Sequence, residues 1–226
     1  MNEICHPLRL VEWRRYHMPR QRRKESPTGI YHWIVRGVNQ KKLFHSEADF
    51  ECFFGLLNEH KVTFGVSVYH YCLMTNHVHV LLHVDCVKAL SRFSYFVLRK
   101  YAHYYGKTHQ WSGQVFRRIF KSLSVDREEY LLECGRYIER NPLQAGIVEK
   151  VGDYPYSSFA SYAYSKPDSI ITSSPAYLGL STNSYLRCEI YRHYVTQGRP
   201  YEVLPACSKF KSIESTGHSP FKLIGT

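Results

Sequence analysis

The sequence predicts an α+β fold built around a four-stranded antiparallel sheet. Four short segments have the β-branched and aromatic content of strands, and two longer segments between them repeat apolar residues at helical spacing. Up to Leu123 these segments follow the order β-α-β-β-α-β, which is the pattern of ferredoxin-like and RRM-like sheets. In such a fold two helices cover one face of the sheet, and the other face is free to carry a site.

The strands are expected at residues 30–35, 66–74, 77–84 and 115–123. Arg36-Gly37 ends the first strand, and a Thr75-Asn76 turn joins the second strand to the third. This order places the third strand near the centre of the sheet, where a side chain on the free face has neighbours on both sides.

Ser46 is the expected N-cap of a helix with apolar residues at i, i+3, i+4 and i+7, namely Phe50, Phe53, Phe54 and Leu57. The second helix repeats the same spacing through Leu90, Phe93, Val97, Tyr101 and Tyr104. A third helix is expected to begin at Asp126, with Glu129 as its capping-box partner, and to end at Asn141-Pro142. After residue 154 the pattern weakens, and one further helix is expected at residues 185–195.

Charge favours a polyanionic partner. The 226-residue chain has a formal net charge of +11, and residues 86–125 contain no Asp or Glu while basic and aromatic residues alternate there. Cations neutralise phosphates and aromatic rings stack on bases, so nucleic acid is the first candidate, an anionic membrane surface the second, and simple solubility the plain alternative. The candidate DNA-binding residues are Arg20, Arg22, Arg23, Arg36, Arg99, Lys100, Arg117, Arg118 and Lys121.

Cysteine usage and hydropathy indicate a reducing, aqueous compartment. The seven cysteines are scattered and never form a C-x-x-C pair, which argues against a disulfide framework and a thiolate zinc site. No apolar run approaches the roughly 18–20 residues of a membrane span, and no secretory signal is evident. A cytoplasmic location is therefore expected.

Two histidines on the third strand form a candidate metal site. Because side chains alternate along a strand, His77 and His79 share one face, with Cβ atoms about 6–7 Å apart. Two imidazoles on a stiff strand can converge on one cation. The plain alternative is a pair of half-exposed surface histidines.

A tyrosine on the third helix is a candidate nucleophile. Tyr137 and Asn141 lie four residues apart and share a helix face. If this helix crosses the free face of the sheet, the phenol of Tyr137 can attack a phosphodiester and the amide oxygen of Asn141 can complete a metal site with His77 and His79. Oxygen and imidazole ligands with open positions suit Mg²⁺ or Mn²⁺. Otherwise Tyr137 is an ordinary core residue.

These motifs together resemble a known family. The segments Gly29–Gly37, Tyr71–Leu82, Gly113–Arg118, Tyr137–Pro142 and Asp153–Phe159 are similar, in order, to the conserved motifs of the single-tyrosine HUH transposases, and most similar to the REP-associated tyrosine transposases of the IS200-like branch. Two features depart from the usual pattern. Thr75 stands where the family often has proline. Met18-Pro19-Arg20 resembles the usual start of the family. Residues 1–17 are therefore expected to be either an extension or the result of a wrongly chosen upstream start codon.

The resemblance implies a reaction and a domain plan. Tyr137 would cleave single-stranded DNA at REP-type hairpins through a 5′-phosphotyrosine, with His77, His79 and Asn141 holding the metal, and a monomer is favoured over a dimer. Residues 1–27 would form a basic arm, residues 28–150 the catalytic domain, and residues 151–226 an extension packed on the core with a flexible tail. Two other functions compete with this one: a domesticated hairpin-binding protein with dormant chemistry, and an RNA-binding RRM-like module.

Overall fold

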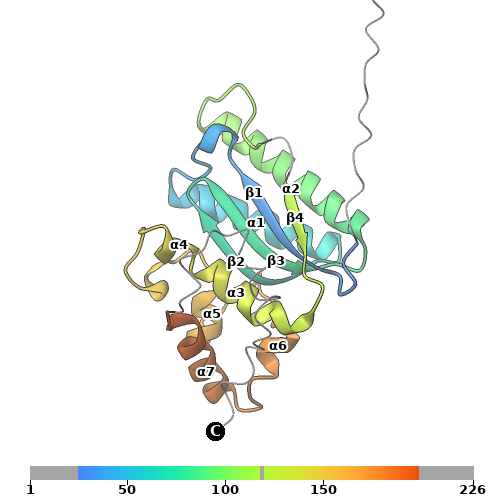
Figure 1. Ribbon diagram of the computed structural model, residues 1–226. Helices are drawn as coiled ribbons and strands as arrows, with labels where there is room; N and C mark the ends of the chain where they lie inside the picture. Colours follow the sequence, from blue (N-terminus) through green and yellow to red (C-terminus); the bar gives the residue numbers. More distant parts are fainter. Residues whose placement is uncertain (1–24, 118–119, 199–226) are drawn as a thin grey trace, which may run out of the picture.

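A four-stranded antiparallel sheet forms the centre of the protein (Figure 1). The computed structural model describes residues 25–117 and 120–198. The strands lie in the order β2-β3-β1-β4. Their bounds are Ile30–Arg36 for β1, Ser67–Met74 for β2, His77–His83 for β3 and Lys121–Ser124 for β4. The expected β-α-β-β-α-β order is confirmed, and β3 is an interior strand as predicted.

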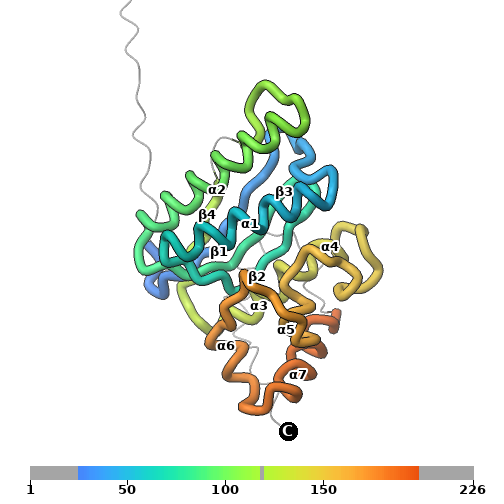
Figure 2. Tube along the Cα trace, turned by 180° about the vertical axis from the view of Figure 1, so that it is seen from behind, coloured from blue at the N-terminus to red at the C-terminus, as the bar shows by residue number. Residues whose placement is uncertain are grey.

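Two long helices cover one face of this sheet (Figure 2). Helix α1 (Glu47–Thr63) begins after Ser46, which forms a capping box with Asp49, so the predicted N-cap is confirmed. Helix α2 (Val87–Thr108) packs beside α1. Alternation along β1 sends its odd-numbered side chains toward these helices. The resulting apolar layer is dominated by Trp33, Phe53, Leu57, Phe93, Val97 and Tyr101, all fully buried.

The opposite face of the sheet carries α3 (Leu131–Glu139), which follows the 3-10 turn Glu128–Tyr130. Cys134 and Ile138 of α3 pack on Ile30 and Leu81 of the sheet. The short helix α4 (Asn141–Gln144) starts directly after α3 with proline in its first turn. The predicted end of the third helix at Asn141-Pro142 is therefore confirmed.

Three further helices pack against α3 on the side away from α1 and α2 (Figure 1). They are α5 (Phe159–Tyr164), α6 (Pro175–Leu178) and α7 (Ser184–Thr196). The last of these is the helix expected at residues 185–195. Short 3-10 turns occupy Val38–Gln40 and Val151–Asp153. A third apolar cluster, which includes Leu132, Phe159, Tyr162, Tyr191 and Val195, joins these helices to α3.

The fourth strand is shorter than the predicted span 115–123. Phe116 pairs with Gly37 only as an isolated bridge, and regular pairing with β1 begins where Lys121 meets Ile34. Between these two contacts the β1 side covers only residues 37 to 34, whereas the partner side covers residues 116 to 121. The two additional residues on the partner prevent a continuous ladder.

The predicted helix start at Asp126 is also wrong. The backbone N–H of Val125 still donates to the carbonyl of Ile30 (3.0 Å), so the chain belongs to the sheet up to that point. It must then turn from the edge of the sheet onto its other face before a helix can begin. The first α-helical residue is consequently Leu131, and Asp126 accepts a hydrogen bond from Ser124 instead of capping the helix.

Across residues 25–117 and 120–198, every helix is too short or too polar to cross a bilayer. Most of the basic arm expected at residues 1–27, and the part of the C-terminal tail beyond residue 198, lie outside the described residues.

Candidate active site

The strand register brings the candidate residues onto the face that α3 covers. Residues paired across antiparallel strands point to the same face. His77 pairs with Arg36, and His79 pairs with Ile34, which in turn pairs with Lys121. His32 pairs with Leu81 and lies on the same face. The helix layer of α1 and α2 is on the other side, so the three histidines lie on the face that carries α3.

His77 and His79 lie side by side, with ring centroids 4.9 Å apart and ring planes at 81°. Each uses its Nδ1 atom in a hydrogen bond. The Nδ1 of His77 lies 2.6 Å from Oδ1 of Asn76, an acceptor, so that nitrogen carries the proton. The Nδ1 of His79 lies 2.8 Å from Nε2 of His32. When His79 donates in this second bond, both histidines keep a lone pair on Nε2.

Burial keeps these imidazoles uncharged. It lowers the pKa of His32 to about 3 and, together with the nearby charge of Arg36, the pKa of His77 to about 4. Burial also sets the pKa of His79 well below the ordinary histidine value, and the neighbouring His32, His77 and Arg36 lower it further. At neutral pH all three rings are therefore neutral, which is the form that binds metals.

Helix α3 places Tyr137 against the histidines. Its half-buried ring meets His79 edge-on, with centroids 6.2 Å apart and planes at 89°, and it meets His32 at 6.1 Å and 75°. Tyr130 and Cys134 lie on the same side of the segment and pack on the sheet with Tyr137, as the helical spacing predicted. Tyr137 thus combines a core-packed ring with a position beside the paired imidazoles.

Asn141 follows α3 and caps its last turn. Its amide nitrogen donates to the carbonyls of Tyr137 (2.7 Å) and Ile138 (3.1 Å). These bonds orient the amide so that Oδ1 remains as its acceptor atom. The structure therefore ties Asn141 to the backbone of Tyr137 itself, one turn from the phenol.

The donor set of His77, His79 and Asn141 fits a divalent metal. It offers two neutral imidazoles, each with its Nδ1 already engaged, and one amide oxygen. In metal sites generally, a hydrogen bond at the second ring nitrogen orients the metal-bound histidine. Among the described residues no group of three or more His, Cys, Asp or Glu side chains could hold a metal, so a site at His77 and His79 would need a ligand of another type, for which Asn141 is the candidate.

A cavity of about 520 Å³ opens next to His77 at the end of β1. Two of the expected DNA-binding residues, Arg36 and Arg117, line it together with Asn76. The backbone N–H of Arg117 donates to the carbonyl of Arg36 (2.8 Å), which fixes the two arginines next to each other. Lys121 is exposed and lies on the same face of the sheet through its pairing with Ile34. Two arginines therefore line the cavity beside His77, and a lysine lies on the same face of the sheet.

Two other expected DNA-binding residues, Arg99 and Lys100, are not brought to this site. Arg99 and Lys100 lie on α2, on the opposite side of the sheet, where Arg99 donates to the hydroxyl of Tyr95 (2.7 Å) and Lys100 pairs with Glu59 (2.6 Å). The remaining four, Arg20, Arg22, Arg23 and Arg118, lie outside the described residues.

His32 was not among the site residues predicted from the sequence. The available signal was its alternation with two isoleucines, Ile30 and Ile34, on a strand that is apolar on both faces. A single histidine in such a position requires a polar neighbour, but the partner, His79, is 47 residues away in the chain.

The family model described as "Transposase IS200 like" matches residues 26–141, just over half of the chain. The chain belongs to the IS200-like transposase family. The matched range begins before β1 and ends at Asn141, so it contains every candidate metal ligand and the candidate nucleophile of this transposase.

The fold agrees with the family. A solved REP-associated tyrosine transposase bound to a REP hairpin superposes with a TM-score of 0.56 at 16% identity, covering 70% of this chain and 93% of that one. A putative transposase from Deinococcus radiodurans gives a TM-score of 0.37 at 18% identity, covering 49% of this chain and 88% of that one, which is too weak to carry an argument. No curated protein matches the chain.

Proposed function

We propose that this transposase is a metal-dependent single-stranded DNA endonuclease and strand transferase that acts through Tyr137. The observation that carries the proposal is the edge-on packing of the Tyr137 ring against His79, 6.2 Å between centroids, on the face of the sheet that bears His77. A phenol beside paired neutral imidazoles is suited to phosphoryl transfer.

In the proposed reaction, Oη of Tyr137 attacks the phosphorus of a phosphodiester. The new bond links the tyrosine to the 5′-phosphate of the downstream strand, and the bond to the 3′-oxygen of the upstream strand breaks. The phenol loses its proton to water, and the departing oxygen gains one to become a 3′-hydroxyl. Attack by a 3′-hydroxyl on the phosphotyrosine reverses the step, so the strand can be rejoined without ATP.

His77, His79 and Asn141 would hold Mg²⁺ or Mn²⁺. When bound, the ion polarises a phosphoryl oxygen and stabilises charge on the transferring group. These three ligands are all neutral, so the negative charge of the substrate phosphate would help to balance the cation. Asn141 also bonds to the carbonyl of Tyr137 (2.7 Å), so the proposed ligand and the nucleophile are oriented by one turn of helix.

Hairpins of the REP type are the proposed DNA. The solved relative of similar fold is bound to a REP hairpin, and Arg36 and Arg117 line a cavity beside His77. Arginine recognises phosphate through paired N–H groups. Tyr137 and the two histidines come from one chain, which supports action as a monomer. A cytoplasmic location, where the chromosomal substrate is found, completes the proposal.

End-labelled DNA tests the reaction directly. A single-stranded REP-type hairpin labelled at its 3′ end should become covalently attached to the protein when Mg²⁺ or Mn²⁺ is present, and the same strand labelled at its 5′ end should give a shorter product with a free 3′-hydroxyl. Tyr137→Phe should form no adduct. Tyr130→Phe is the matched control, because Tyr130 packs on the same apolar cluster, and it should form the adduct normally.

Absence of an adduct with the wild-type protein, or an undiminished adduct with Tyr137→Phe, would leave a hairpin-binding protein without this chemistry. Equal competition by RNA and DNA would instead favour an RNA-binding module.

A further inference from the structure

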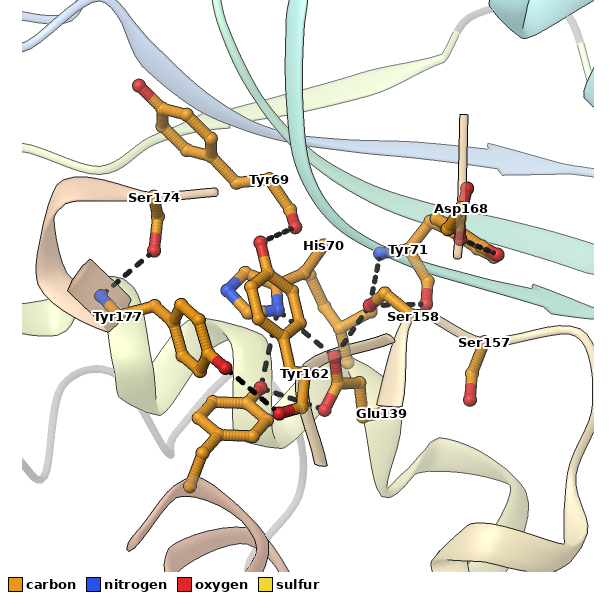
Figure 3. Close-up of polar contacts among 12 residues, drawn as sticks. Tyr69, His70, Tyr71, Glu139, Ser157, Ser158, Tyr162, Asp168, Ser174 and Tyr177 are labelled. Carbon is orange, nitrogen blue, oxygen red and sulfur yellow. Dashed lines mark hydrogen bonds and ion pairs between the residues drawn. The ribbon is translucent and has the colours of Figure 1, made fainter. Parts of the chain in front are cut away.

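A buried carboxylate lies on α3 two residues beyond Tyr137. Glu139 is fully buried and accepts three hydrogen bonds, from Nδ1 of His70 (3.0 Å), the hydroxyl of Ser158 (2.6 Å) and the hydroxyl of Tyr191 (2.8 Å). Figure 3 shows His70 and Ser158 converging on it. A carboxylate without such donors would be costly to bury, so this arrangement is built around Glu139.

The three donors come from three different parts of the fold. His70 is on β2, Ser158 is the N-cap residue of α5, and Tyr191 is on α7. Ser158 is itself tied to β2, because its hydroxyl accepts from the backbone N–H of Tyr71 (3.0 Å) and its own N–H donates to the carbonyl of Tyr71 (3.0 Å). Glu139 therefore joins α3 to the strand that pairs with β3, where His77 and His79 lie.

A second polar connection joins α3 to α7. Arg136 donates to the carbonyl of Tyr194 (3.0 Å), and Arg140, one turn on, donates to the carbonyls of Val195 (2.8 Å) and Thr196 (3.1 Å). Both arginines are buried. The last carbonyls of a helix lack partners within it and carry partial negative charge, so buried guanidinium groups satisfy them well.

Gly135 sets how closely α3 approaches the sheet. A Cβ atom at this position would lie 2.7 Å from Cε1 and Nε2 of the His70 ring, well inside contact distance. The helix backbone thus rests directly on the ring that also donates to Glu139. This contact limits how closely α3 can lie above β2.

We propose that Glu139 is the positioning residue for Tyr137, and that residues 157–197 serve to hold α3 in the rotation that packs the Tyr137 ring against His79. This inference rests on the proposed function. Helix α3 has nine residues, too few to be stable alone, so its orientation must come from tertiary contacts. Tyr137 and Glu139 are about 200° apart around the helix. A rotation of α3 that breaks the hydrogen bonds of Glu139 therefore also moves the Tyr137 ring. A displacement of about 1 Å at a reacting group can cost about 10²-fold in rate.

Tyr191→Phe is the first test, because it removes one donor to Glu139 and keeps the ring. The matched control is Tyr101→Phe, which removes a buried hydroxyl bonded to the carbonyl of Leu43 (2.6 Å) in the helix layer on the far side of the sheet. We expect Tyr191→Phe to lower the single-turnover rate of hairpin cleavage about 10-fold with the Kd for the hairpin unchanged. Tyr101→Phe should cleave at the wild-type rate, even though both variants lower the Tm.

Equal rates for the two variants would overturn the positioning role and leave Glu139 a purely structural residue. Glu139→Gln extends the test, since the amide keeps an acceptor oxygen but cannot accept all three donors. Its rate should fall further than that of Tyr191→Phe, again with hairpin affinity unchanged, and a wild-type rate would contradict the proposal.

Hydrogen–deuterium exchange provides a readout that needs no cleavage. Tyr191→Phe should speed exchange of the α3 amides and leave α1 unchanged, whereas Tyr101→Phe should do the reverse. If the wild-type protein forms no covalent adduct, the proposed function fails but this measurement still decides whether the network holds α3. Unchanged protection of the α3 amides in Tyr191→Phe would show that the hydrogen bonds around Glu139 do not hold α3 in place.

Discussion

The two faces of the sheet are buried to a similar degree but have very different chemistry. The face under α1 and α2 is packed with apolar and aromatic side chains, and the buried polar side chains on that side are Asp49, His60 and Ser94 among the described residues. The face under α3 buries histidines, arginines and carboxylates, which include His32, His70, His79, Glu133, Arg136, Glu139 and Arg140.

We infer from this difference that the face under α1 and α2 mainly supplies stability, whereas the face under α3 mainly supplies the geometry for chemistry. Apolar burial on the helix face supplies free energy without demanding directional partners. Each buried polar group on the α3 face must be satisfied by a partner, so it contributes less net free energy but fixes geometry. The following predictions test this division, from the largest expected effect to the smallest.

Phe93→Ala should affect stability alone. Phe93 is fully buried against Trp33, with ring centroids 5.8 Å apart, so truncation leaves a cavity. We expect a loss of about 3–5 kcal/mol in the free energy of unfolding, measured by urea denaturation. The fraction that stays folded should cleave DNA at the wild-type rate. A loss below about 1 kcal/mol would show that the helix face is not the main source of stability.

His77→Ala should affect chemistry alone. Removing a metal ligand should lower adduct formation by at least about 10²-fold and weaken Mn²⁺ binding, with little change in Tm because His77 is only half-buried. His83→Ala is the matched control, since His83 ends the same strand on the same face. Equal activity of the two variants would remove His77 from the site.

Asp49 makes the stability of the helix face depend on pH. Burial would raise the pKa of this carboxyl, but hydrogen bonds from His45, His109, Ser46 and Tyr104 outweigh it and hold the pKa below 3.8. Because the folded pKa is below the unfolded one, the stabilisation is present above about pH 3.8 and is lost as the pH falls through the folded value.

Asp49→Asn should therefore lower the free energy of unfolding by about 1–3 kcal/mol at pH 7 and by less at pH 3, measured by urea denaturation at both values. A difference from wild type that is the same at the two pH values would contradict the assignment.

Arginines on the two faces should also differ in their contribution to DNA binding. Arg117 lines the cavity beside His77, whereas Arg99 lies on α2 and donates to Tyr95. We expect Arg117→Ala to reduce the salt slope of hairpin binding by about one and Arg99→Ala to leave it unchanged, measured by titration at several salt concentrations. Equal slopes for the two variants would mean that the DNA also contacts the helix layer.

The sequence was sufficient for features set by local periodicity. Alternation in residues 77–84 placed His77 and His79 on one face, and the spacing of Cys134 and Tyr137 placed the tyrosine on the packed side of its helix. Ser46 was recognisable as a cap because capping depends on residues within three positions. Each of these features depends only on residues that are close in sequence, so it can be predicted without knowing the tertiary fold.

Features that depend on distant partners were not predictable. The start of α3 at Leu131 follows from the pairing of Val125 with Ile30, and the short β4 follows from a mismatch in length against β1. His70 and Glu139 are 69 residues apart, and nothing local marks either as one half of a buried pair. Glu139 looks in sequence like a solvent-exposed helix residue, and only the donors around it show otherwise.

The family match ends at residue 141, yet the partners of Glu139, Arg136 and Arg140 include side chains and carbonyls between residues 158 and 196. A gene fragment that stops near the end of the match would remove Ser158 and Tyr191 as donors to Glu139, together with the α7 carbonyls that Arg136 and Arg140 bind. These buried charged groups would then keep only part of their partners. Anyone who transplants this catalytic unit into another protein must therefore carry its C-terminal helices along, although homology alone would mark them as dispensable.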